Sequence, residues 1–123
     1  MLFDRLRRLR DALAPDAGAV PEPAVVQTGE GRFEFHWRGL PLAFDRRRND
    51  VLRGGRPLLR RVDIRSVDVT HQRADEDDPE LWKVSLATGA FASVEIGRTT
   101  DDVEASIAAA RLSTALAVKV RSL

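Results

Sequence analysis

The sequence predicts a single α+β domain in which a series of antiparallel strands precedes one long helix. Apolar and polar residues alternate through much of the stretch from residue 24 to residue 97, which is typical of strands with one buried face. The intervals between these runs are too short for crossover helices, so we expect neighbouring strands to pair antiparallel. Residues 100–120 then carry alanine and leucine at helical spacing. This order of elements is typical of the α+β class.

The composition is that of one globular domain. The chain has 123 residues, of which 43% are hydrophobic and 32% are charged, enough to build one core. It contains no cysteine, which excludes disulfides, thiolate metal sites and cysteine nucleophiles. The net charge is +1, but residues 1–61 have a charge balance of +5 and residues 62–123 a balance of −4. This asymmetry would suit head-to-tail association or an anion at one end, although charges spread over a solvated surface are the more ordinary interpretation.

Residues 1–14 predict a short amphipathic helix with one apolar stripe and arginine at positions 5, 7, 8 and 10. The apolar residues are Leu2, Phe3, Leu6, Leu9 and Leu13. Pro15 ends this helix, a linker containing proline and glycine covers residues 15–24, and residues 25–123 form the main domain. Because so short a helix is marginal alone, its stripe is expected to pack on its own domain, on a partner chain or on a membrane surface.

The main domain is expected to contain six or seven strands. In the clearest run, residues 32–38, the aromatic residues at positions 33, 35 and 37 point one way and the polar residues between them point the other. Further runs are expected around residues 40–44, 51–52, 62–69, 81–86 and 92–96. A change of phase at Arg65-Ser66 indicates a bulge or a short connection.

Residues 100–120 predict the long helix, with Thr99 or Thr100 as its cap. Its apolar residues form two nearly opposite faces. One face holds Val103, Ile107, Ala110, Thr114 and Ala117, and the other holds Ala109, Leu112 and Leu116. A helix that is apolar over more than half its circumference is covered on two sides. We expect the sheet to cover one side, and the N-terminal helix of the same chain or of a second copy to dock on Leu112 and Leu116.

Two stretches carry an order of features found in a known family. They are LAFDRRRNDVLRGGRPLLRRVDIRSVDV and LWKVSLATGAFASVEIGRTTDDVEASIAAARLSTAL, with an acidic loop between them. In this order of strands, turns and final helix, the chain from about Leu42 to Val118 resembles the bacterial PH-like (pleckstrin-homology-like) domains of unknown function. The resemblance implies a strongly bent antiparallel sheet or barrel of six to seven strands, closed at one end by the C-terminal helix. Many bacterial relatives carry membrane-spanning helices before the domain, whereas this chain has a basic amphipathic helix there.

Seven arginines crowd a span of 16 residues around two predicted turns. They are Arg46, Arg47, Arg48, Arg53, Arg56, Arg60 and Arg61. Clustered guanidinium groups grip phosphate oxygens in a forked geometry, which makes this span a candidate anion-binding site. On alternating strands the same residues would be divided between two faces, so a solvated arginine-rich surface is the alternative.

No catalytic site, metal site or cofactor is predicted. The acidic residues in the stretch 75–80 lack the glycine and the distant glutamate of a calcium loop. His36 and His71 fall at polar positions of separate strands, where surface histidines are the ordinary interpretation. No serine elbow or glycine-rich phosphate loop is present in the sequence.

These observations favour a non-enzymatic protein-interaction or assembly module that binds a protein partner or itself. The alternative is a peripheral membrane or anion-binding module that uses the arginine span and the basic N-terminal helix. Nucleic acid is not expected as a partner because no aromatic RNA-binding signature accompanies the arginines, and no small-molecule substrate is evident. The expected location is the cytoplasm, with the alternative of a peripheral position on the inner membrane.

Overall fold

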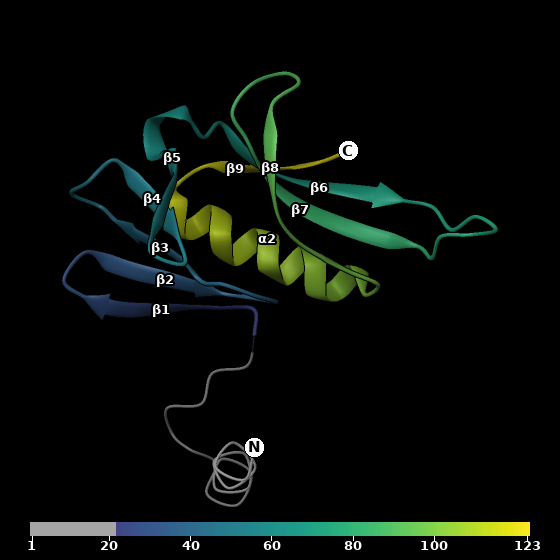
Figure 1. Ribbon diagram of the computed structural model, residues 1–123, viewed down its shortest axis with the longest axis horizontal. Helices are drawn as coiled ribbons and strands as arrows, with labels where there is room; N and C mark the ends of the chain where they lie inside the picture. The colour runs from purple at the N-terminus through teal and green to yellow at the C-terminus, as the bar shows by residue number, and fades with distance from the viewer. Residues whose placement is uncertain (1–21) are drawn as a thin grey trace, which may run out of the picture.

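The computed structural model describes residues 22–123, which form two β-sheets and one α-helix (Figure 1). This confirms the α+β class, and the described part of the chain holds nine strands where six or seven were expected. The strands are β1 (Ala24–Gly29), β2 (Arg32–His36), β3 (Leu42–Asp45), β4 (Asp50–Arg53), β5 (Arg56–Arg60), β6 (Ser66–Gln72), β7 (Leu81–Ala87), β8 (Ser93–Thr99) and β9 (Lys119–Ser122). A turn of 3-10 helix, η1 (Arg61–Asp63), lies between β5 and β6, and the α-helix is α2 (Asp102–Leu116).

The first sheet is an antiparallel meander with the strand order β1-β2-β3-β4-β5. Its inward-facing residues meet across the strands, as in the pairs Phe35 with Leu42 and Phe44 with Val51. Gly54 and Gly55 take left-handed backbone angles, with φ of 59° and 82°, in the tight turn between β4 and β5. The alternation therefore predicted the buried positions Phe35, Trp37, Leu42 and Phe44 correctly, whereas Leu40, which the run around residues 40–44 placed with them, is 63% exposed.

The second sheet has the strand order β8-β7-β6-β9 and contains one parallel pair. β6, β7 and β8 are antiparallel neighbours, but β9 runs parallel to β6 from the pair Ser66 and Lys119 onward. The expectation of a wholly antiparallel sheet was wrong for this pair, because α2 itself provides the crossover that a parallel connection requires. The phase change at Arg65-Ser66 corresponds to the short connection after η1.

The helix α2 is shorter than residues 100–120 because its N-cap lies later in the sequence than expected and its C-cap lies earlier. Asp101, rather than a threonine, is the N-cap, and its side chain accepts the backbone N–H groups of Val103 and Glu104. At the other end Ala117 adopts a left-handed conformation with φ of 58°, and the Val118 N–H bonds the carbonyl of Ser113. The helix therefore ends before Ala117, and the residues from Lys119 onward are free to form β9.

The core lies where α2 meets the two sheets, and the helix contacts β1 on one side and β6, β7, β8 and β9 on the other (Figure 1). Its largest fully buried side chains include Trp37, Phe35, Leu42, Leu86, Leu112 and Leu116. Trp37 packs directly over the backbone of Gly97 in β8, where a Cβ atom would come within 2.6 Å of the indole ring. This contact joins the end of the first sheet to the edge strand of the second.

Candidate functional site

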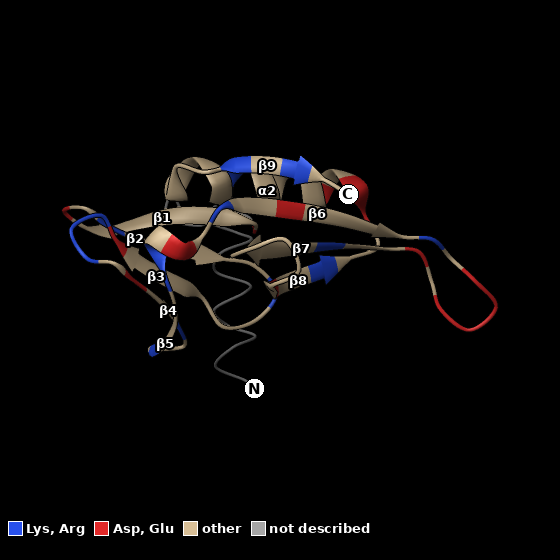
Figure 2. Cartoon of the chain, turned by 90° about the horizontal axis from the view of Figure 1, so that it is seen from above, with Lys and Arg blue, Asp and Glu red and all other residues tan. Residues whose placement is uncertain are grey.

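The seven arginines of the predicted anion site do not come together on one surface (Figure 2). Arg53 points inward from β4 and donates to the backbone carbonyls of Glu95 and Ile96 in β8, at 3.1 and 2.9 Å. Arg61 donates to the carbonyl of Leu116 at the C-terminal end of α2, at 3.1 Å. These two side chains tie the first sheet and η1 to neighbouring elements, so their guanidinium groups serve the fold.

Arg60 pairs with Asp63 at 3.2 Å on the exposed surface, and Arg56 is exposed in β5. The remaining three arginines lie exposed in the turn between β3 and β4, which residues 46–49 form. The Arg46 guanidinium lies 4.7 Å from the centre of the Phe33 ring.

Arg47 pairs with Glu30 at 3.2 Å in the same region. Arg48 lines a shallow groove of about 400 Å³ on the first sheet together with Glu34, Asp45 and Asp50. Carboxylates therefore accompany the basic residues at this end of the sheet, where both colours appear in Figure 2.

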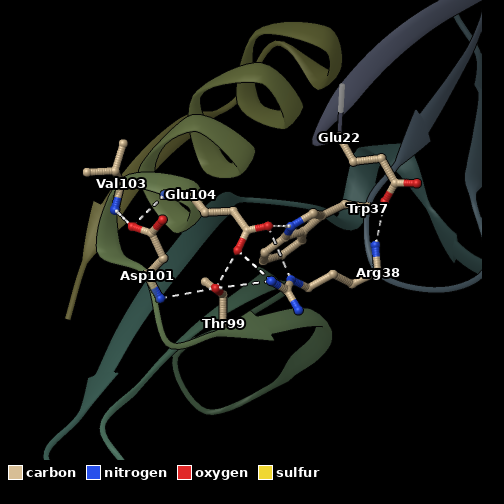
Figure 3. A network of polar contacts seen from close by, with 7 residues as sticks. All are labelled: Glu22, Trp37, Arg38, Thr99, Asp101, Val103 and Glu104. Atoms are coloured by element: carbon tan, nitrogen blue, oxygen red, sulfur yellow. Dashed lines mark hydrogen bonds and ion pairs between the residues drawn. The ribbon is translucent and has the colours of Figure 1, made fainter. Parts of the chain in front are cut away.

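The densest polar network of the described chain surrounds Glu104 in the first turn of α2 (Figure 3). Its carboxylate accepts Arg38 Nη2 at 2.7 Å, Arg38 Nε at 3.3 Å and Trp37 Nε1 at 3.2 Å, and the Thr99 hydroxyl completes the set. The Arg38 hydrogen bond, assisted by those from Thr99 and Trp37, lowers the pKa of Glu104 to about 2. Trp37 and Arg38 lie in the segment that follows β2, and Thr99 ends β8, so the network joins both sheets to the helix.

The same network fixes the chain where it enters the domain. Arg38 has a left-handed backbone angle, φ of 46°, and its N–H donates to the Glu22 carboxylate at 2.9 Å. A carboxylate that accepts four hydrogen bonds and stays ionised far below neutral pH is too weak a base to take up a proton in a reaction at pH 7. The arrangement is suited to clamping three elements and is not suited to general acid–base chemistry.

Another carboxylate, that of Asp68 in β6, is buried at 4% exposure, and its oxygens are also fully engaged by donors. It accepts Arg121 Nη2 at 2.8 Å, Arg121 Nε at 3.0 Å and the Ser66 hydroxyl at 2.7 Å. The Arg121 hydrogen bond is the main cause that lowers the pKa of Asp68. Because Asp68 and Arg121 are directly opposed across β6 and β9, this pair secures the parallel strand.

Both histidines lie beside carboxylates, as expected of polar positions. His36 lies 2.9 Å from Glu34, and His71 lies 2.7 Å from Glu80. The His71 ring also stacks on the indole of Trp82, with ring centres 4.6 Å apart. Within residues 22–123 no group of three His, Asp or Glu side chains could hold a metal ion.

The predicted docking residues of α2 lie elsewhere than expected. Leu112 and Leu116 are 0% and 1% exposed in the core, so they present no surface to a partner segment. The opposite face carries Val103 and Ile107, which are 61% and 38% exposed. We call the stripe of Val103, Ile107, Ala110 and Thr114 the outer face of α2. The N-terminal residues assigned to partner binding, Leu2, Phe3, Leu6, Leu9 and Leu13, lie outside the described residues.

The outer face leads into a groove of about 550 Å³ between α2 and β1. The groove is lined by Ala24, Val25, Phe33, Arg46, Ala110, Arg111, Thr114 and Ala115. Two of these residues, Ala110 and Thr114, belong to the outer face, so the groove and the exposed apolar stripe are continuous. Arg111 at the groove donates to the carbonyl of Pro23, which places the entry of the chain beside it.

No protein-family model, curated protein or solved structure matches the chain. In the part that the structure describes, no helix is long and apolar enough to cross a membrane.

Proposed function

We propose that this chain is a non-enzymatic protein-interaction module with a PH-like fold, and that its binding surface is the outer face of α2 with the adjoining groove. The observation that carries this proposal is the exposure of Val103 and Ile107 on a helix whose opposite face is fully buried. Exposed apolar side chains that adjoin a groove are typical of a binding surface. The saturated carboxylates of Glu104 and Asp68 further support a role other than catalysis.

The PH-like fold is part of the same proposal. A five-stranded antiparallel meander, a second sheet and a helix that contacts strands of both sheets support it. The parallel strand β9 is an addition to the pattern expected from the family resemblance.

The chemistry of the surface indicates what kind of partner would bind. The outer face of α2 is aliphatic at Val103 and Ile107. Next to these residues, at the N-terminal end of the helix, lie the exposed acidic residues Asp101 and Asp102. An amphipathic helix lays an apolar stripe against such a surface, and basic residues beside the stripe would meet the acidic border. We therefore infer that the partner segment is an amphipathic helix with flanking lysine or arginine.

Site-specific photocrosslinking tests this function in cells that make the full chain. A benzoylphenylalanine at position 107 should form an adduct with a second protein, distinguished by its mass from an internal crosslink to residues 2–13, and the crosslinked peptide, identified by mass spectrometry, should be amphipathic and basic. The control is the same group at position 91, because Phe91 is fully exposed in the β7–β8 turn and is also apolar. The identified segment should then bind the purified full chain, and Ile107→Asp should weaken that binding at least about tenfold. Equal adducts at both positions, no adduct at 107 or unchanged affinity of Ile107→Asp would contradict the proposal.

The second candidate function is anion or peripheral membrane binding through Arg46, Arg47 and Arg48. It is favoured by the exposure of these three residues in one turn. Flotation with vesicles that contain phosphatidylserine, at low and high salt, tests it because binding by surface arginines is strongly screened. Salt-sensitive flotation that is lost in Arg47→Glu/Arg48→Glu would support this candidate, and absence of flotation at low salt would refute it.

A further inference from the structure

We propose that the N-terminal segment of the same chain, residues 2–13, docks on the outer face of α2 and competes there with the partner. This inference rests on the proposed function because it assigns an occupant to the same surface. The segment would act as an intramolecular cover that a partner must displace. Three observations support it: where the chain enters the domain, how far the connecting residues reach, and how the two surfaces match in chemistry.

The entry point of the chain lies beside α2. The Pro23 carbonyl accepts a hydrogen bond from Arg111, near the middle of the helix, and Glu22 accepts the N–H of Arg38 at 2.9 Å. Arg38 is in turn bound to Glu104 in the first turn of α2. Residues preceding Glu22 therefore start from a point next to the helix.

The connecting residues are long enough to reach the whole outer face. The eight residues 14–21 span up to about 27 Å when extended, at about 3.4 Å for each residue. The outer face runs from Val103 to Thr114, or about 16 Å at 1.5 Å for each residue. A helix over residues 2–13 would be about 18 Å long, which matches the stripe it would cover.

The two surfaces match in apolarity, and they match in charge at the N-terminal end of α2, whereas Arg46 and Arg111 line the groove farther along the helix. As the helix expected from the sequence, the segment would offer a stripe of leucine and phenylalanine to the aliphatic outer face and the groove, with four arginines beside the stripe. Exposed Asp101 and Asp102 stand at the start of α2, where they can pair with those arginines. A tether of eight residues would give the segment a millimolar effective concentration at the helix, which favours a contact within one chain over a second copy at micromolar protein.

Engineered cysteines test this docking in the full chain, since the native sequence has none. In the variant Leu9→Cys/Ile107→Cys, oxidation should give a crosslinked monomer whose yield does not change on dilution. The matched control is Leu9→Cys/Val62→Cys, because Val62 is apolar and 68% exposed but lies on η1. The Ile107 pair should crosslink at least about tenfold faster than the control, because docking would hold position 9 beside position 107 and away from position 62.

Maleimide labelling tests the same docking without oxidation, in case disulfide formation perturbs the chain. Maleimide should label the single variant Ile107→Cys about tenfold faster when Leu6→Glu and Leu9→Glu are added, because these charges prevent docking. Disulfide-linked dimers would overturn the inference in favour of a second copy, and protection that appears only with anionic vesicles would overturn it in favour of a membrane. Equal labelling rates would overturn it as well. Partner adducts at position 107 would still stand in that case, so failure of this inference is distinguishable from failure of the proposed function.

Discussion

Replacing Glu104 by glutamine tests whether its carboxylate clamps the helix to the two sheets. Glu104→Gln keeps the shape of the side chain but removes its charge, and its NH2 group replaces one of the two oxygens that accept hydrogen bonds from Arg38, Trp37 and Thr99. The hydrogen bonds that Glu104 now accepts from Arg38 Nη2 and Trp37 Nε1 are 2.7 and 3.2 Å long. We expect the variant to fold but to be less stable at neutral pH.

The expected loss follows from the pKa of Glu104. Its folded-state pKa is about 2, and an unfolded glutamate has a pKa near 4.3, so the difference corresponds to about 3 kcal/mol at neutral pH. The Glu104 side chain is 21% exposed and its partner Arg38 is 50% exposed, and water screens such a pair. We therefore expect Glu104→Gln to lower the free energy of unfolding by about 1.5 kcal/mol.

The pH dependence gives the sign of the effect. Because the folded-state pKa is lowered, the stabilisation is fully present above about pH 5 and is lost as the pH falls toward 2. Urea unfolding, followed by tryptophan fluorescence, should show the full difference between wild type and Glu104→Gln at pH 7 and about half of it near pH 3. Glu76→Gln in the exposed acidic loop is the control and should change stability by less than about 0.5 kcal/mol. A Glu104→Gln difference that is absent at pH 7, or constant down to pH 3, would refute the reasoning.

Two further predictions concern the junction between the sheets. Gly97→Ala should lower the free energy of unfolding by about 1–3 kcal/mol, because its Cβ would lie 2.6 Å from the Trp37 ring, whereas Gly89→Ala meets nothing within 4 Å and should be neutral in urea unfolding. Arg53→Met should cost about 1–3 kcal/mol because the carbonyls of β8 lose two charged donors, while thermal melting should show little change for the exposed Arg56→Met. Equal stability within either pair of variants would contradict the structural role assigned to Gly97 or Arg53.

The buried face of the first sheet was predictable because its signal is local. Phe35, Trp37 and Leu42 are buried at the positions that a period of two assigns to one face. β9 was missed because the stretch Lys119–Ser122 continues an alanine-rich helical pattern and has only one valine. Its strand conformation depends on pairing with β6 and on the bond between Asp68 and Arg121, which no local pattern encodes.

The candidate site was predicted only in part, for a related reason. Two apolar faces of α2 were recognised, but the sequence does not distinguish a face that packs on a sheet from one that remains exposed. The larger pair, Leu112 and Leu116, lies in the core, and Val103 and Ile107 lie outside. The Glu104 network was missed because its partners Trp37 and Arg38 stand 67 and 66 positions away. In the sequence Glu104 is indistinguishable from any acidic residue of a first helical turn.

The parallel pairing of β9 with β6 sets the order in which this fold can be completed. Strand neighbours in the first sheet are consecutive in sequence, so that sheet needs only short loops to close. β6 and β9 pair across 53 positions, as Asp68 and Arg121 do, and closing so long a loop is slow. Until β9 is in place, the backbone groups on the edge of β6 that faces away from β7 have no strand partner. Slow pairing of β9 therefore prolongs the time during which this strand edge can pair with another chain, and this raises the risk of aggregation.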